Sequence, residues 1–254
     1  MAITGPTAIR PFRDFDNVGQ YDTNDTTNSA GNGTNALVAG NLYLVHISSF
    51  SSGAAELPTS VTFGLGTADE LAFAKVTDGT DTAEQTGFGL TGNTHSLWYA
   101  FAPSNTSARP WSVIFGGTQS AAIIAVSEYA GVDQTGTFPQ VVLATGTSTT
   151  PAATMASFGA TDNVALLFLC RDDISATFTP TEGRSESYDY SDTERNSQAL
   201  HYQNPHGSDT SLNATITSDD WAAIGVEIKA AVAAGDNAPR PRIITQARQR
   251  AAYW

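Results

Sequence analysis

The sequence predicts an all-β protein built as a two-sheet antiparallel β-sandwich, with an extended arm at each end. Short apolar stretches recur along the chain, and turns rich in Gly, Asn, Asp, Pro and Thr separate them. Charged residues make up only 15% of the chain, as is typical of strands whose exposed faces carry hydroxyl groups. No stretch has the periodicity of a long helix. Many short strands at this spacing favour two packed sheets.

The expected strands are stretches in which apolar residues alternate with polar ones or run continuously. In chain order they cover residues 42–50, 60–63, 70–76, 96–102, 111–115, 120–129, 141–144, 154–158, 163–170, 176–179, 185–190, 198–202, 211–216 and 221–231. The last stretch is rich in alanine, which favours a helix. In this stretch, Ile224, Val226 and Ile228 alternate with Gly225 and Glu227, and this alternation favours a strand.

The stretch 120–133, SAAIIAVSEYAGVD, is the clearest single strand signal. Its small and β-branched apolar residues are typical of a strand that is buried on both faces. Glu128 and Tyr129 end the strand, and Ala130-Gly131 forms a turn. Because no nucleophile or second acid accompanies Glu128, we interpret this stretch as part of the framework.

Composition divides the chain into three segments. Residues 1–36 are rich in Thr, Asn, Asp and Gly and predict an extended N-terminal arm. Residues 37–234 hold the expected strands and form the sandwich domain. Residues 235–254 form a C-terminal arm, extended at Pro239 and Pro241, with Tyr253 and Trp254 at its end. Aromatic side chains are common interface anchors, although a tail can also fold back onto its own domain.

Charge is distributed unevenly. The net charge is −13, which disfavours binding of nucleic acid by the body. Six of the 12 basic residues nevertheless lie in residues 1–13 and 235–254, where Asp236 is the one acid. The arms therefore either dock on acidic surfaces or remain solvated, and both interpretations stay open. The expected interface residues are Arg10, Phe12, Arg13, Phe15, Arg240, Arg242, Arg248, Arg250, Tyr253 and Trp254.

The titratable residues predict no metal site or cofactor. A zinc site needs three or four converging ligands, and the chain offers His201 and His206 near each other but no usable cysteine. His46 and His95 lie in strand-like runs and are expected to be structural. The segment YDTNDTTN, residues 21–28, has oxygen ligands at alternate positions but lacks the glycine and distal glutamate of a calcium loop.

The sequence also predicts no catalytic site. Hydrolysis of a glycoside needs two carboxylates that face each other, and Glu128 and Glu227 are the best candidates. Both are more simply explained as solvent-facing groups or as partners of an arginine or lysine. The adjacent acids at 172–173 and 219–220 point to opposite faces of a strand or lie in turns. The common hydrolase, metalloprotease and nucleotide-binding motifs do not occur.

Cys170 lies in the apolar run ALLFLC and is expected to be buried and unreactive. The chain shows no signal peptide and no apolar run long enough to cross a membrane. We therefore expect a product that is made in a cytoplasm and remains soluble there, with no membrane partner.

The apolar stretches together resemble a known module. They are GNLYLVHISSF (40–50), HSLWYAFAP (95–103), AAIIAVSEYAGVD (121–133), TDNVALLFLCRDD (161–173) and DDWAAIGVEIKAA (219–231). Their order is similar to that of a β-sandwich module of bacteriophage virion proteins and some bacterial surface proteins. The resemblance covers residues 37–232, includes neither arm and carries over no catalytic residue.

The resemblance implies a jelly-roll-like sandwich in a virion structural protein, such as a capsid decoration or minor capsid protein. Its partners would be other copies of itself, in a closed ring such as a trimer, and major capsid or tail proteins. The protein would be assembled in the host cytoplasm and located in the virion, and would not be an enzyme. The alternative is a tail-associated adhesin that binds a receptor or surface carbohydrate by aromatic stacking. The aromatic residues considered for it are Trp98, Tyr99, Tyr188, Tyr190 and Tyr202.

Overall fold

The computed structural model confirms the all-β antiparallel class. Every regular element in the described part of the chain is a β-strand, and every strand pair is antiparallel. The strands form four sheets, two more than predicted. The structure describes residues 2–14, 18–22, 35–173, 177–181, 183–191, 197–206 and 210–232.

The first ten strands form two sheets, which we call the first sandwich. The first inner sheet has the order β1-β10-β3-β8-β6, with β7 also paired to β8, and the first outer sheet has the order β2-β9-β4-β5. The strands are β1 (Thr4–Asp14), β2 (Val18–Asp22), β3 (Leu42–Phe50), β4 (Pro58–Phe63), β5 (Leu71–Ala72), β6 (Ala74–Lys75), β7 (Glu84–Thr86), β8 (Asn93–Phe101), β9 (Trp111–Gln119) and β10 (Ala121–Ala130).

The remaining eight strands form the second sandwich. The second inner sheet has the order β11-β18-β13-β16-β15, and the second outer sheet has the order β12-β17-β14. The strands are β11 (Gln140–Ser148), β12 (Ala152–Thr154), β13 (Val164–Arg171), β14 (Thr179–Pro180), β15 (Ser185–Ser191), β16 (Ser197–Gln203), β17 (Ser211–Thr215) and β18 (Asp219–Ile228).

The two sandwiches repeat one topology. In the first, the strands pair in a nested way: β1 with β10, β2 with β9, β3 with β8 and β4 with β5. In the second, β11 pairs with β18, β12 with β17 and β13 with β16. The inner-sheet order β1-β10-β3-β8 thus corresponds to β11-β18-β13-β16, and the outer-sheet order β2-β9-β4 corresponds to β12-β17-β14. The local strand patterns of the sequence do not predict this repeat.

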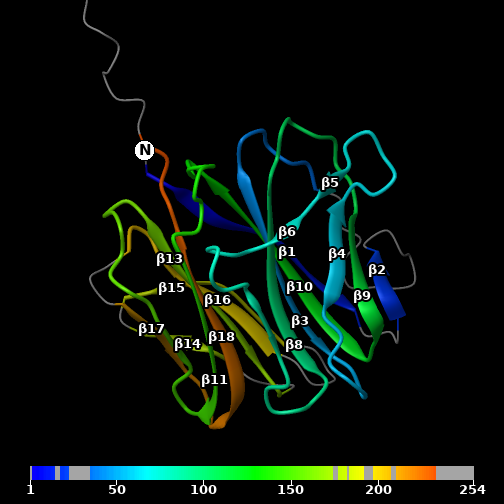
Figure 1. Cartoon of the computed structure of the whole chain (residues 1–254), viewed down its shortest axis with the longest axis vertical. Helices are drawn as coiled ribbons and strands as arrows, with labels where there is room; N and C mark the ends of the chain where they lie inside the picture. The colour runs from blue at the N-terminus through cyan, green and yellow to red at the C-terminus, as the bar shows by residue number, and fades with distance from the viewer. Residues whose placement is uncertain are drawn as a thin grey trace, which may run out of the picture.

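The sandwiches lie side by side and pack through their inner sheets (Figure 1). We call this contact the seam. Leu42 and Leu44 on β3 belong to one buried cluster with Phe168 on β13 and Ile224 on β18. Two further cores, each between an inner and an outer sheet, complete a stack of four layers. Both inner sheets are therefore buried on both faces.

Strand β10 confirms the prediction for the stretch 120–133. Ala125 and Tyr129 on one face of β10 pack into the seam, and Ile124 and Val126 on the other pack against the first outer sheet. Successive side chains of a strand point to opposite faces, so a strand in such a place needs a continuous apolar run. The alanine-rich stretch at 221–231 also forms the predicted strand, as β18.

The N-terminal segment is not a free arm where it is described. Strand β1 pairs with β10 at the edge of the first inner sheet, and β2 pairs with β9 at the edge of the first outer sheet. This result corrects the prediction of an arm for residues 4–14 and 18–22. An edge strand tolerates polar residues and proline, such as Pro6 and Pro11 in β1, because half of its backbone groups need no partner strand.

The stretch 70–76, predicted as one strand, forms two short strands in different sheets. Strand β5 pairs with β4 in the first outer sheet, and β6 pairs with β8 in the first inner sheet. The chain crosses between the layers at Phe73, whose side chain packs in the core between them.

Gly89 allows the two sandwiches to approach each other closely at one end of the seam. It lies in the turn between β7 and β8 and has a φ of +66°. A Cβ at this position would lie 2.9 Å from the Cβ of Asp220 and 3.1 Å from that of Asp172, both in the second sandwich. Only glycine adopts this backbone conformation without strain and also leaves room for these neighbours.

Gly89→Ala is therefore expected to lower the free energy of unfolding by about 2 kcal/mol, through backbone strain and overpacking. Urea denaturation measures this change. Gly87→Ala is the matched control, because Gly87 has a φ of +72° in the same turn but open space around it. The control is expected to cost about 1 kcal/mol. Equal losses in the two variants would contradict the close contact.

Candidate functional site

Glu128, the acid considered for catalysis, anchors the loop before β3. Its Oε1 accepts hydrogen bonds from Asn41 Nδ2 at 2.5 Å and from the hydroxyl of Tyr43 at 2.8 Å. The same hydroxyl accepts a bond from the backbone N–H of Val38 at 2.7 Å. Burial raises the pKa of Tyr43 above its usual value, so this hydroxyl keeps its proton at neutral pH. Glu128 is half-buried and committed to these neighbours.

Glu227, the other candidate acid, has the equivalent place in the second sandwich. Its Oε1 accepts from Asn163 Nδ2 and from the backbone N–H of Gly159, and its Oε2 accepts from Gln140 Nε2 at 2.7 Å. Its side chain is fully buried. Asn163 Oδ1 in turn accepts from the backbone N–H of Ala230 at 3.1 Å, which ties the loop before β13 to the end of β18.

The two carboxylates occupy matching positions in the repeated topology. Glu128 is aligned with Tyr43, two residues after Asn41, and Glu227 is aligned with Ala165, two residues after Asn163. We call each pair an Asn–Glu clip. Both carboxylates point away from the seam, toward their own outer sheets. They therefore do not face each other across a groove, as a pair of glycosidase carboxylates would.

Each clip has a signal in the sequence, which the predictions above do not include. An asparagine stands directly before an apolar central strand, in GN-LYLV and again in DN-VALL. A glutamate stands near the end of the antiparallel neighbour, in SEYAG and again in VEIKA. These repeated pairs are the local signal of the repeated topology.

A polar cluster lies inside the seam. His46 Nε2 and His95 Nε2 are 2.7 Å apart, and His46 Nδ1 is 2.7 Å from the hydroxyl of Tyr188 on β15. Beside them, Ser48 donates to Gln198 Oε1 at 2.9 Å, which forms a second bond across the seam. Burial lowers the pKa of His95 to about 3 and that of His46 well below its usual range, so both imidazoles are neutral at pH 7. The expectation that they are structural agrees with this placement.

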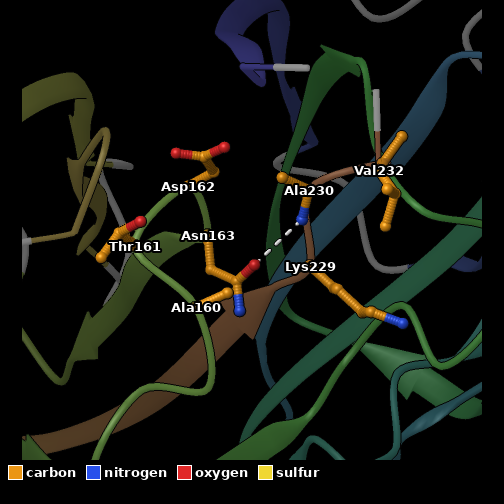
Figure 2. Close-up of a pocket in the computed structure, with 8 residues that line it drawn as sticks. Ala160, Thr161, Asp162, Asn163, Lys229, Ala230 and Val232 are labelled. Atoms are coloured by element: carbon orange, nitrogen blue, oxygen red, sulfur yellow. Dashed lines mark hydrogen bonds between the residues drawn. The ribbon is translucent and has the colours of Figure 1, made fainter. Parts of the chain in front are cut away.

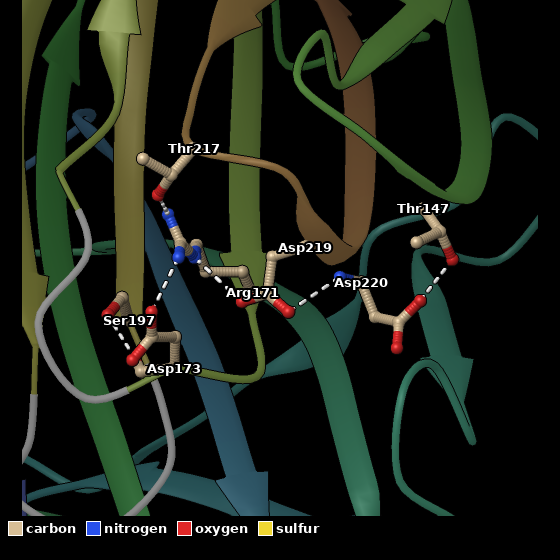
Figure 3. A network of polar contacts seen from close by, with 7 residues as sticks. All are labelled: Thr147, Arg171, Asp173, Ser197, Thr217, Asp219 and Asp220. Carbon is tan, nitrogen blue, oxygen red and sulfur yellow. Dashed lines mark hydrogen bonds and ion pairs between the residues drawn. The ribbon is translucent and has the colours of Figure 1, made fainter.

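Arg171 organises a charged network at one end of the second inner sheet (Figure 3). Its side chain is buried, with an exposed fraction of 2%. Nε lies 3.0 Å from Asp219 Oδ2, one terminal nitrogen lies 2.6 Å from Asp173 Oδ2, and the other lies 3.2 Å from Thr217 Oγ1. The network joins the chain after β13 to the turn between β17 and β18. Asp173 and Asp219, for which the sequence left a strand or a turn open, are thus ion-paired.

A pocket of about 280 Å³ opens where β18 ends (Figure 2). The loop 160–163 and residues 229–232 line it, and Asn163 joins the two walls through its bond to Ala230. Lys229 is already paired with Asp133 at 2.8 Å. The lining includes no histidine, cysteine or serine, and its polar side chains are those of Thr161, Asp162, Asn163 and Lys229.

The two other histidines do not converge. His201 is buried and its Nε2 lies 3.3 Å from Glu186 Oε2. Burial, together with the nearby Arg184, lowers the pKa of His201 to about 4. His206 stacks on Phe158 with a ring distance of 4.1 Å. Within the described ranges, no group of three or more His, Cys, Asp or Glu side chains could hold a metal ion. Cys170 is buried, as predicted.

The aromatic residues considered for sugar stacking are not exposed. Trp98 and Tyr188 are buried, and Tyr99, Tyr190 and Tyr202 are half-buried against the seam core. Tyr188 and Tyr190 stack on each other with ring centroids 5.2 Å apart. These side chains therefore contribute to packing.

The predicted arm residues fall mostly outside the described part. The backbones of Arg10, Phe12 and Arg13 lie in β1, opposite Val126, Ile124 and Ile123 of β10, and their side chains are not described. The other predicted arm residues lie outside the described residues, as do Asn24 and Asp25. They are Phe15, Arg240, Arg242, Arg248, Arg250, Tyr253 and Trp254.

Comparison with known proteins finds no family model, no curated protein and no solved structure that matches the chain. The resemblance to phage virion modules therefore stays a prediction. Among the described residues, no helix is long and apolar enough to span a membrane.

Proposed function

We propose that this chain is a structural protein of a bacteriophage virion, either a capsid decoration protein or a minor capsid protein. The observation that carries the proposal is the nested strand pairing of both sandwiches. In a jelly roll, an antiparallel ribbon is wound up so that the first strand pairs with the last, the second strand pairs with the next to last, and so on inward. The strands of this chain pair in this way. Jelly rolls are common in viral capsid proteins and in lectins.

The chemistry of the described side chains supports a structural role. Glu128 and Glu227 are committed to the Asn–Glu clips, and His46 and His95 are enclosed in the seam. Outside residues 1–13 and 235–254 the chain has 24 acidic and six basic residues, so acidic groups of the body greatly outnumber basic ones. An acidic body of this kind is complementary to the basic segment 235–254 of a neighbouring copy.

The C-terminal segment is therefore expected to act in assembly. Light scattering compares the mass of the full chain with that of a chain ending at residue 234, at low and at high salt. The proposal predicts a closed oligomer for the full chain and a loss of mass for the shortened one. Exchange of Arg240, Arg242, Arg248 and Arg250 for lysine should preserve assembly at low salt, and exchange for serine should weaken it.

Location is tested separately by immuno-electron microscopy of the phage particles. Label on the capsid supports a decoration or minor capsid role, and label on the tail supports a tail-associated role. Unchanged assembly and unchanged incorporation after removal of 235–254 would contradict docking through this segment. Specific binding on a glycan array would favour the adhesin alternative. The burial of Trp98 and Tyr188, two of the aromatic residues considered for sugar stacking, disfavours that alternative.

A further inference from the structure

We propose that the seam between the two sandwiches is an acid-sensitive joint. In this joint, protonation of the His46–His95 pair weakens the contact of the two inner sheets and opens the seam to solvent. The proposal concerns the fold itself and does not depend on a virion role.

Proton counting shows why the pair resists a further proton. Each neutral imidazole carries one N–H, and the 2.7 Å contact between the two Nε2 atoms requires that only one of them is protonated. His46 Nδ1 forms a hydrogen bond with the hydroxyl of Tyr188, whereas His95 Nδ1 is buried and has no hydrogen-bond partner. A third proton would therefore make a cation that is fully enclosed.

The second sandwich offers no countercharge for such a cation. Strand β15 presents Tyr188, and β16 presents Gln198, whose Nε2 is buried without a hydrogen-bond partner. Strand β13 presents Phe168, at 5.1 Å from the His46 ring, and then Cys170. Strand β18 presents Ile224 and Ala222. Beyond Cys170 and Ala222 come the carboxylates of Asp172 and Asp220, which lie against Gly89 at the end of the seam.

The first sandwich offers none either. Next to the pair on β3 and β8 are Ser48 and Leu97, and β10 places Ala125 opposite His46. The charged pair Lys75–Glu84 aligns with Trp98 and Ser96, whose side chains point to the opposite face from His95. No ion pair or hydrogen bond joins a described carboxylate to either imidazole.

The sign of the pH effect follows from proton uptake. A histidine released from the seam titrates near 6.5, whereas His95 in the closed seam titrates at about 3. The open form therefore binds more protons between these values, and stability that is present above 6.5 is lost as the pH falls. His95 alone shifts the opening equilibrium by about tenfold per pH unit in this window. Burial also lowers the pKa of His46, so His46 acts in the same direction. Tyr188, whose pKa burial raises, stays protonated throughout.

Cys170 provides a native probe of opening. It is the one cysteine of the chain, it is buried, and it packs with Phe88 of the first sandwich and Ala222 of the second. A thiol reagent such as dithiodipyridine, which also reacts in acid, modifies it only when the seam opens. The labelling rate of the full chain is measured from pH 7 to pH 4.5 and divided by the rate of a model thiol.

The proposal predicts that this normalised rate rises at least tenfold per pH unit below about 6 in the native protein. It also predicts that the rise depends weakly on urea, because a local opening exposes less surface than global unfolding. In the double variant His46→Gln, His95→Gln, which carries neutral amides, the rise should disappear. His201→Gln is the matched control, because His201 is buried outside the seam, and it should keep the rise.

Equal acceleration in the native protein and in the double variant would overturn the proposal, as would no acceleration in the native protein. If Cys170 in the double variant is labelled as fast as a model thiol at pH 7, the seam of that variant is already open. Histidine NMR of the native protein then tests the proposal. Both imidazoles must then remain neutral while Cys170 is protected. Titration near pH 6.5 with Cys170 still protected would show that the closed seam accepts the cation, and would refute the joint.

Discussion

Glu227→Ala is expected to lower the free energy of unfolding by about 3–5 kcal/mol, because it leaves three hydrogen-bond donors without their acceptor at a buried site. The substitution deprives Asn163 Nδ2, Gln140 Nε2 and the backbone N–H of Gly159 of their acceptor. These donors come from three parts of the second sandwich, so the loops before β11 and β13 should also loosen. Urea denaturation measures the loss, and hydrogen exchange locates it.

Glu128→Ala is the matched comparison, because Glu128 holds the same place in the first sandwich. Glu128 is only half-buried, so water can satisfy Asn41 Nδ2 and the Tyr43 hydroxyl after the substitution. We expect a loss of about 1–2 kcal/mol. A loss from Glu128→Ala as large as that from Glu227→Ala would contradict the role of burial in this difference.

The two clips also show why the sequence could be interpreted only in part. Glu128 looked exceptional because it ends an apolar strand, and nothing local indicated its partner. Asn41 is 87 residues away along the chain and reaches Glu128 only through the pairing of β10 with β3. Strand existence depends on local periodicity, and could be predicted for β10, β13 and β18. Side-chain partnerships depend on register, which local patterns do not reveal.

The N-terminal strands β1 and β2 could not be predicted for a different reason. β1 has the sequence TGPTAIRPFRD, in which proline, arginine and threonine break any alternation. Such a strand forms because β10 provides an ordered partner along its whole length, so tertiary context overrides weak propensity. The seam was likewise hidden, because His46 and Ser48 interrupt an otherwise apolar face of β3 without any local indication that Tyr188 and Gln198 satisfy them.

Arg171→Met is expected to lower the free energy of unfolding by about 3 kcal/mol. Methionine keeps much of the buried aliphatic volume but removes the guanidinium that joins Asp173, Asp219 and Thr217. The two carboxylates would then face each other without a cation. They are partly exposed, at 39% and 23%, so water recovers part of their solvation and limits the loss.

Arg109→Met tests whether burial of the cation, rather than the ion pair as such, determines the cost. Arg109 lies 2.9 Å from Asp69, but its side chain is 35% exposed, against 2% for Arg171. An exposed pair is screened by salt and contributes less than about 1 kcal/mol. Urea denaturation at low and high salt should therefore show a small, salt-dependent loss for Arg109→Met and a large one, little affected by salt, for Arg171→Met. Comparable losses would mean that Arg171 stabilises the fold as a surface charge does, and that the turn between β17 and β18 is held by its backbone alone.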